Sequence, residues 1–167
     1  MWEKGEENEP STLVMIPALN EEHGIGPTLA EIKDHLNGLP CMVVDGRSTD
    51  ATTKIAEAMG ALIVPQKGTG KGDAVATAIG HAGALSVKYV AFIDADFTYP
   101  AEYLPEMVRI LEENPDVGMV CGNRFNTHFH LKNMANIFYT GNRLIAHLHN
   151  LFNGTQMRDP LTGMRVI

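Results

Sequence analysis

Residues 89–100 read Tyr-Val-Ala-Phe-Ile-Asp-Ala-Asp-Phe-Thr-Tyr-Pro and join an unbroken apolar run to two acidic residues. The run is rich in β-branched and aromatic side chains, is too short for a helix, and is typical of a buried strand in a parallel sheet. Asp94 and Asp96 follow the run, and side chains of extended backbone alternate with a period of two. We therefore expect both carboxylates on one side of the strand's carboxyl end, where open α/β sheets bind ligands.

Two neighbouring carboxylates repel each other unless a cation lies between them. Mg²⁺ prefers oxygen ligands, keeps some of its waters, and is commonly shared between one or two carboxylates and the phosphates of a substrate. Asp94 and Asp96 therefore predict a site for a metal ion and a diphosphate. The structural alternative is a strand that runs into an acidic, solvated turn and binds nothing.

Further apolar runs flank this stretch, with helical segments between them. The helical segments carry apolar residues every three or four positions, as in Ile25, Leu29 and Ile32. The alternation predicts an α/β fold with a mostly parallel, Rossmann-like sheet and helices on both faces. The expected strands are residues 13–16, which Pro17 ends, then 41–44, 61–64, 89–93 and 117–121.

Length and net charge limit the classes of protein to which the chain can belong. Its 167 residues suffice for one domain, and we assign residues 11–167 to that domain and residues 1–10 to a flexible N-terminal segment. Residues 164–167 read as the opening of another strand, so we expect the native chain to continue. The formal net charge of -7 argues against general affinity for nucleic acid, so an anionic ligand needs local basic groups or a metal.

Cysteine content and hydropathy bear on the compartment. Cys41 and Cys121 are the two cysteines, and both lie in apolar runs, which favours buried, reduced thiols and a cytoplasmic protein. No apolar segment is long enough to cross a bilayer, and the acidic residues 1–10 do not resemble a signal peptide. We therefore expect no transmembrane helix in this segment.

Polar residues follow the other predicted strands as well. Asn20 and Glu21 come after the first strand, Asp45 ends the second, and Asp50 stands a few residues further on. The carboxyl ends of parallel strands share one edge, so these side chains are expected to meet the two acids after the central strand in one crevice. As structural alternatives, Asp50 can stabilise the first turn of a helix and Asn20 can close a turn.

A glycine-rich basic loop precedes the third helical segment. Residues 67–72 read Lys-Gly-Thr-Gly-Lys-Gly and offer unobstructed backbone amides, two cations and a helix amino terminus, which suit phosphate oxygens or a ribose. The spacings of the P-loop and of the dinucleotide fingerprint are both absent. The structural alternative is a flexible surface loop.

Residues 94–98 also satisfy the pattern Asp-x-Asp-x-Thr of HAD-like aspartyl phosphatases, with Asp94 as nucleophile and Asp96 as acid. In that class the pattern normally begins at the first strand of the fold, whereas here it follows the fourth expected strand. The chain after it holds no acidic pair that resembles the second metal-binding motif of those enzymes. The phosphatase is therefore a rival hypothesis from another reaction class.

Six short motifs follow one another along the chain. They are residues 16–22 (Ile-Pro-Ala-Leu-Asn-Glu-Glu), 43–50 (Val-Val-Asp-Gly-Arg-Ser-Thr-Asp), 71–74 (Lys-Gly-Asp-Ala), 93–96 (Ile-Asp-Ala-Asp), 122–124 (Gly-Asn-Arg) and 159–165 (Asp-Pro-Leu-Thr-Gly-Met-Arg). Their order and spacing resemble family 2 glycosyltransferases of the GT-A fold, particularly dolichyl-phosphate mannose synthases and related polyprenyl-phosphate glycosyltransferases. The resemblance spans nearly the whole chain.

The resemblance implies a role for each matching position. Lys71 would lie near the donor, and Asp94 and Asp96 would bind the metal and address the sugar and the metal-bound diphosphate. The family more often has Asp-Asp where this chain has Asp45-Gly46. The residues that would surround the nucleotide base and ribose are Pro17, Ala18, Asn20, Glu21 and Asp45.

The reaction that the resemblance implies is the transfer of mannose or glucose from GDP-mannose or UDP-glucose, with inversion at the anomeric carbon. Mg²⁺ or Mn²⁺ would stabilise the departing diphosphate, with Asp96 among the catalytic residues. The third hypothesis is a nucleotide-sugar-binding module without turnover.

The expected acceptor is dolichyl or polyprenyl phosphate. A phosphate monoester is largely ionised at neutral pH, so it requires a cationic pocket in place of a dedicated base. Arg124 and Arg165 are expected to bind that phosphate, with Arg143 and Arg158 as further candidates. If the acceptor is a sugar hydroxyl, Asp159 becomes the natural base; its structural alternative is a turn-forming Asp-Pro.

A lipid acceptor would require contact with the membrane surface at its cytoplasmic face. The expected helix over residues 132–152 carries Phe138, Tyr139 and Phe152, which could lie along the headgroups. The alternative is an ordinary core helix.

Overall fold

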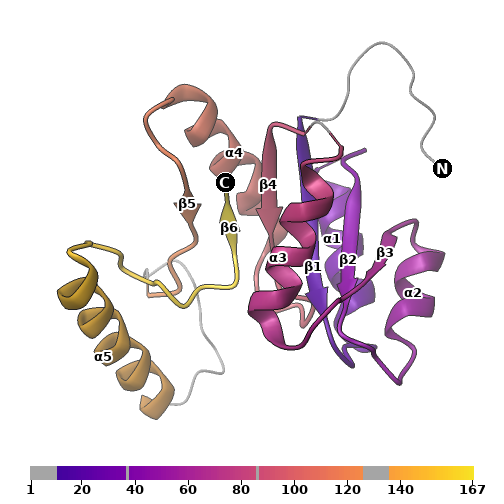
Figure 1. Ribbon diagram of the computed structural model, residues 1–167, viewed down its shortest axis with the longest axis horizontal. Coiled ribbons are helices and arrows are strands. Elements are labelled where there is room, and N and C mark those ends of the chain that lie inside the picture. Colours follow the sequence, from indigo (N-terminus) through magenta and orange to yellow (C-terminus); the bar gives the residue numbers. More distant parts are fainter. Residues whose placement is uncertain (1–10, 37, 86, 126–135) are drawn as a thin grey trace.

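A computed structural model describes residues 11–36, 38–85, 87–125 and 136–167, so the predicted flexible segment 1–10 and residues 132–135 of the predicted long helix lie outside the described residues. Figure 1 shows a sheet with helices packed against it and a long helix at one end. The strands are β1 (Thr12–Ala18), β2 (Cys41–Asp45), β3 (Leu62–Pro65), β4 (Tyr89–Phe92), β5 (Val120–Cys121) and β6 (Arg165–Val166).

The six strands form one sheet in the order β3-β2-β1-β4-β6-β5. The first four run parallel, with Ile16 of β1 opposite Val43 of β2 and Val14 of β1 opposite Ala91 of β4. β6 lies between β4 and β5 and runs antiparallel to both. The expected α/β fold with a mostly parallel sheet is confirmed, and the strand expected at the end of the chain is the antiparallel member.

Two predicted strand boundaries are wrong. β1 continues through Pro17, which lies opposite Val44 of β2, whereas β4 pairs with β1 only as far as Met15. Pro17 therefore faces a neighbouring strand on one side only, and a residue without an amide hydrogen is tolerated at such a position. β5 is confined to Val120–Cys121, the two residues that pair with β6, and the preceding Val117 and Met119, which were expected to join it, are exposed.

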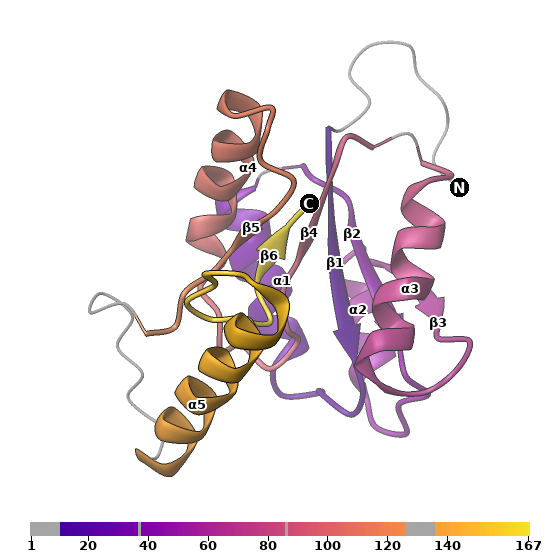
Figure 2. The same cartoon turned by 60° about the vertical axis from the view of Figure 1, so that its left-hand side comes forward.

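Helices cover both faces of the sheet, as expected. The helices are α1 (Ile25–His35), α2 (Thr52–Ala58), α3 (Gly70–Ala82), the 3-10 turn η1 (Ala101–Tyr103), α4 (Leu104–Glu113) and α5 (Asn136–Asn153). Val14 and Ile16 of β1 belong to a buried cluster with α1 and α4, whereas Leu13 and Met15 belong to a second cluster with α3. The alternation of β1 side chains thus builds one core on each face, and Figure 2 shows α3 opposite α1 and α4.

Helix α5 lies beyond the β5 and β6 end of the sheet in both views. Ala146 is buried, whereas five large apolar side chains of this helix are between 41% and 82% exposed, so the expectation of a plain core helix does not hold for this stretch. None of the described helices is long and apolar enough to cross a membrane. The exposed apolar residues are Leu144, Ile145, Leu148, Leu151 and Phe152.

Candidate donor site at the strand ends

A cavity of about 410 Å³ opens where β1 and β4 end. It brings together segments that are far apart in sequence, as the shared-edge argument predicted. Six residues predicted to contact the donor line it, namely Pro17, Ala18, Glu21, Lys71, Asp94 and Asp96. The remaining lining residues are Leu19, Gly46, Gln66, Thr69, Gly70, Ala74 and Ala95.

The two acids after β4 lie beyond the strand. β4 ends at Phe92, and Phe97 adopts a φ of 60°, so the chain turns directly after Asp96. Asp96 Oδ1 accepts hydrogen bonds from the Thr98 amide at 3.1 Å and from the Thr98 hydroxyl at 2.6 Å. Asp94 and Asp96 thus lie just past the last residue of β4, and both line the cavity at the carboxyl end of that strand.

The residue before α1 approaches this turn closely enough to exclude any side chain. A Cβ on Gly24 would lie 2.5 Å from the Ala95 carbonyl oxygen and 2.7 Å from the Asp96 Cα. The Thr28 hydroxyl donates a hydrogen bond to the same Ala95 oxygen at 3.3 Å. The backbone that carries the acids is thus held against α1.

Lys71, in the first turn of α3, forms an ion pair with Asp94, and its ammonium contacts Asp94 Oδ1. The Lys71 side chain is 57% exposed and that of Asp94 is 22% exposed. The loop before Lys71 is ordered by the Gly68 amide, which donates to Asp73 Oδ2 at 2.7 Å, and by Gly70, whose φ is 80°. The basic loop therefore reaches the cavity, where its role in binding phosphate stays a prediction.

Negative charge accumulates at this edge of the sheet. Burial, together with the charges of Asp96, Asp50 and Asp94, raises the pKa of Glu21. Each added carboxylate makes the ionisation of its neighbours less favourable. A cation bound here would relieve that repulsion.

Asn20 and Asp45 hold the loops after β1 and β2 and are absent from the cavity lining. Asp45 is buried and accepts hydrogen bonds from the amides of Arg47 at 3.0 Å and Ser48 at 3.2 Å. Asn20 Oδ1 accepts from the Thr49 amide at 2.8 Å, and the Asn20 amide donates to Ser48 Oγ at 2.9 Å. Their direct contact with a donor stays a prediction, whereas their observed contacts shape the rim.

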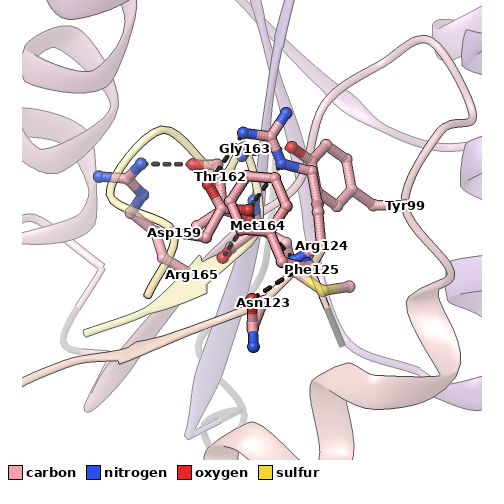
Figure 3. A network of polar contacts seen from close by, with 9 residues as sticks. All are labelled: Tyr99, Asn123, Arg124, Phe125, Asp159, Thr162, Gly163, Met164 and Arg165. Carbon is pink, nitrogen blue, oxygen red and sulfur yellow. Dashed lines mark hydrogen bonds and ion pairs between the residues drawn. The ribbon is translucent and has the colours of Figure 1, made fainter. Parts of the chain in front are cut away.

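Arg124 and Asp159 were predicted as separate functional groups and form a single bidentate ion pair (Figure 3). Arg124 Nε lies 2.7 Å from Asp159 Oδ2, Nη2 lies 2.9 Å from Oδ1, and the Arg124 amide also donates to Oδ2 at 3.1 Å. The Asp159 side chain is 1% exposed and that of Arg124 is 16% exposed. Hydrogen bonding with Asp159 raises the pKa of Arg124. Asp159 could act as a base only if this pair opened.

The loop over residues 159–164 connects that ion pair to the turn after β4. The Gly163 amide donates to the Tyr99 hydroxyl at 2.7 Å, and the Arg165 guanidinium contacts the Thr162 carbonyl (Figure 3). Arg165 is half-buried in β6. Its predicted contact with an acceptor phosphate therefore stays a prediction, and its observed partner is the loop itself.

A second cavity, of about 400 Å³, lies beside α5. It contains Arg143 and Arg158, the further candidates for binding an acceptor phosphate, together with His147. None of the described residues that line it is acidic. The other lining residues are Asn123, Phe125, Ala146, Asn150 and Met157.

Within the described ranges, no three His, Cys, Asp or Glu side chains gather into a ready-made metal site. Asp94 and Asp96 supply two carboxylates, which suits a Mg²⁺ or Mn²⁺ ion that takes its other ligands from water and substrate phosphates. Sequence reasoning missed Gln66, a buried residue that lines the cavity and donates from Nε2 to the Gly70 carbonyl at 2.7 Å. Its place directly after β3 was the available signal.

Comparison with known proteins identifies relatives. The family model described as glycosyl transferase family 2 matches residues 13–166. The chain is 34% identical over 152 residues to glycosyltransferase AglJ from Haloferax volcanii. It is also 34% identical over 152 residues to a protein named dolichyl-phosphate hexose transferase from the same organism. Each alignment covers 91% of this chain, but the chain spans only 48% of the first relative and 64% of the second.

Solved structures of glucosyl-3-phosphoglycerate synthase from Mycobacterium tuberculosis share the fold. The complex with Mn²⁺, uridine diphosphate and phosphoglyceric acid has a TM-score of 0.74 at 25% identity and covers 93% of this chain and 55% of that chain. The complex with Mn²⁺, UDP-glucose and glycerol 3-phosphate has a TM-score of 0.68 at 27% identity, covering 93% of this chain and 56% of that chain. The expected GT-A fold is confirmed, and the phosphatase hypothesis loses its support.

Proposed function

Because this chain belongs to glycosyl transferase family 2, we propose that it transfers a hexose from a nucleotide-diphosphate sugar to a phosphate-bearing acceptor. The hexose is mannose or glucose, carried by GDP-mannose or UDP-glucose, and the transfer inverts the anomeric carbon. The acceptor is dolichyl or polyprenyl phosphate, in keeping with the name of one relative. The observation that carries the proposal is the meeting of Lys71, Asp94 and Asp96 in one cavity at the strand ends.

The cavity suits a nucleotide-diphosphate sugar in size and chemistry. Its volume of about 410 Å³ falls in the range of small-molecule sites, roughly 300–1,000 Å³. Pro17, Ala18 and Leu19 offer apolar surface for a base, while Lys71 offers a cation for the phosphates. The lining thus combines apolar and charged groups of the kinds that one donor requires.

The two carboxylates after β4 fit a divalent cation shared with the donor. Asp94 and Asp96 would hold Mg²⁺ or Mn²⁺, which neutralises the charge that develops on the departing diphosphate. The ion pair of Lys71 with Asp94 Oδ1 supports this assignment, because the Asp94 carboxylate already accepts a positively charged neighbour. The exposed, flexible lysine side chain can turn from Asp94 towards a bound diphosphate.

The buried ion pair of Arg124 and Asp159 favours an acceptor that is already ionised. A hydroxyl acceptor needs a base, and both carboxylate oxygens of Asp159 accept hydrogen bonds from Arg124. A phosphate monoester has a second pKa of about 6, so it carries its nucleophilic charge at neutral pH without help from the protein. The pair thus argues against Asp159 as the base for a hydroxyl acceptor, and it occupies Arg124 to the same degree, so a phosphate would require Arg124 to leave Asp159.

Helix α5 fits contact with a lipid surface on the cytoplasmic face, where such an acceptor would lie. Its large apolar side chains Leu144, Ile145, Leu148, Leu151 and Phe152 are exposed. The helix contains one arginine, two histidines and no acidic residue, although the whole chain carries a net charge of -7. Apolar and basic character on one helix is typical of peripheral binding to anionic membranes.

A transfer assay tests the proposal. Purified protein is incubated with labelled UDP-glucose or GDP-mannose, polyprenyl phosphate in detergent, and Mg²⁺ or Mn²⁺, and the lipid fraction is extracted. We expect a labelled glycolipid from the wild type and from Asp116→Ala, which removes an exposed acid outside the cavity, but not from Asp96→Ala. Donor binding without any product would instead identify a binding module and refute the transferase.

A further inference from the structure

The Asp94 carboxylate lies directly against the backbone of Gly163. A Cβ on Gly163 would stand 1.9 Å from Asp94 Oδ2 and 2.4 Å from Asp94 Cγ, far inside van der Waals contact. The other carboxylate oxygen, Oδ1, contacts the Lys71 ammonium. Asp94 is therefore held between a lysine on one side and a glycine backbone on the other.

A buried hydrogen bond fixes the position of that glycine. The Gly163 amide donates to the Tyr99 hydroxyl at 2.7 Å, and Tyr99 is 6% exposed (Figure 3). Tyr99 belongs to the same segment that carries the acids after β4. The hydrogen bond thus joins the loop of residues 159–164 to the turn that it supports.

The opposite end of the loop is fixed as firmly. Asp159 is held by Arg124 through three hydrogen bonds. The Thr162 amide donates to the Asp159 carbonyl at 3.4 Å, and Thr162 Oγ1 accepts from the Met164 amide at 3.3 Å. Asp159 is 3% exposed and Thr162 and Met164 are each 1% exposed, so these parts of the loop are packed into the protein, whereas Leu161 between them is 45% exposed.

We propose that Gly163 and Tyr99 are positioning residues that aim the Asp94 carboxylate into the donor cavity, and that Asp159, through Arg124, holds this wall in place. The proposal rests on the proposed function, because the orientation of the Asp94 carboxylate affects activity only if a metal ion and a diphosphate bind beside it. A methyl group at position 163 forces the Asp94 carboxylate to rotate away, because the end of a side chain yields more easily than packed backbone. Position 163 therefore controls metal binding without contacting the metal.

The test compares two glycine variants by Mn²⁺ titration in the presence of UDP or GDP. Gly163→Ala places its methyl on Asp94, whereas Gly118→Ala places its methyl in open space and serves as the control. Partners that orient a metal ligand typically change metal affinity by about 10–100-fold, and we expect a weakening of that size for Gly163→Ala and none for Gly118→Ala. Tyr99→Phe removes one hydrogen bond and should weaken Mn²⁺ binding about three- to tenfold.

Mn²⁺ binding by Gly163→Ala or Tyr99→Phe that equals the wild type overturns the proposal. If Gly163→Ala is too unstable to titrate, the melting temperatures of the wild type, Gly163→Ala, Asp94→Ala and the double variant decide. The fall in melting temperature caused by Gly163→Ala must be smaller when Asp94 is already alanine, because the added methyl then meets no carboxylate. A destabilisation that stays the same in both backgrounds also overturns the proposal.

The same measurements separate this proposal from the proposed function. If wild-type protein binds neither UDP nor GDP with Mn²⁺, the donor function fails, and the variant cycle still tests whether Gly163 supports Asp94. If the wild type binds and Gly163→Ala binds equally well, the donor function stands and the positioning role fails.

Discussion

The ion pair between Arg124 and Asp159 predicts a large and specific loss of stability. Asp159→Ala leaves the Arg124 guanidinium, 16% exposed, without its carboxylate partner. Removing one member of a buried pair costs about 3–5 kcal/mol, because the remaining charge is uncompensated. For a chain of this size, about 2–4 °C of melting temperature corresponds to each kcal/mol, so we expect a drop of about 10 °C.

A second ion pair in the same chain provides the control. Arg109 lies 2.6 Å from both Glu106 and Glu113, a separation similar to the 2.7 Å between Arg124 and Asp159. Its partners and its own side chain are 53–55% exposed, so Arg109→Ala should cost at most about 1 kcal/mol. The two variants are therefore expected to differ in their stability cost because the two ion pairs differ in solvent exposure, whereas their distances are similar.

Urea unfolding of both variants measures these costs. The double variant Arg124→Met with Asp159→Leu should recover most of the loss, since an apolar pair of similar volume replaces a buried ion pair at little cost. Equal destabilisation by Asp159→Ala and Arg109→Ala would refute the reasoning. So would a double variant less stable than Asp159→Ala alone.

Three further predictions address the site and the core. Lys71→Met should bind Mn²⁺ in the absence of nucleotide up to about fivefold more tightly in a direct titration, because loss of the ion pair frees the Asp94 carboxylate for the metal. The factor follows from the value of an exposed ion pair, which is at most about 1 kcal/mol. Unchanged affinity would contradict competition between Lys71 and the metal for Asp94. Gly24→Ala should lower the free energy of unfolding by about 3 kcal/mol, because its methyl would lie 2.5 Å from the Ala95 carbonyl oxygen. Gly80→Ala lies inside α3 with open space around its methyl, so it should raise the free energy of unfolding by about 0.5–1 kcal/mol, since alanine favours helix more than glycine does. Burial raises the pKa of Cys41 to about 11, so the folded state keeps its thiol proton. The thiol of the unfolded chain ionises near pH ~8.5, so the wild type keeps its full free energy of unfolding below that pH and should lose about 1.4 kcal/mol per pH unit relative to Cys41→Ala as the pH rises towards about 11. Urea unfolding of the two proteins that depends on pH in the same way would exclude this effect.

The sheet and the convergence of its strand ends could be predicted because they depend on local patterns. Apolar runs alternate with helical periodicity, and parallel strands necessarily share an edge, so Glu21, Asp94 and Asp96 were expected together and line one cavity. The position of β6 could not be predicted in this way. Nothing in residues 165–166 specifies that they insert antiparallel beside Ala91, since strand pairing is a property of the whole fold.

Polar residues at the strand ends show where sequence reasoning reached its limit. Asp45 and Asp94 both follow apolar runs, yet Asp45 is buried and caps the turn at Arg47, whereas Asp94 faces the cavity. The same carboxylate can serve as a cap or as a ligand, and the distinction depends on which backbone amides lie nearby. The pairing of Arg124 with Asp159 was missed for a related reason, because contacts between distant segments leave no periodic signal.

The most direct test of the account is the melting temperature of the wild type and of Asp96→Ala with UDP or GDP, each with and without Mn²⁺. A ligand at about 100 times its dissociation constant stabilises by about 2.7 kcal/mol, which corresponds to about 5 °C or more in a chain of this size. We predict this rise for the wild type only when nucleotide and Mn²⁺ are both present, and its loss in Asp96→Ala. Equal stabilisation of both proteins, or stabilisation of the wild type by the nucleotide alone, would contradict a metal held by the acids at the strand ends.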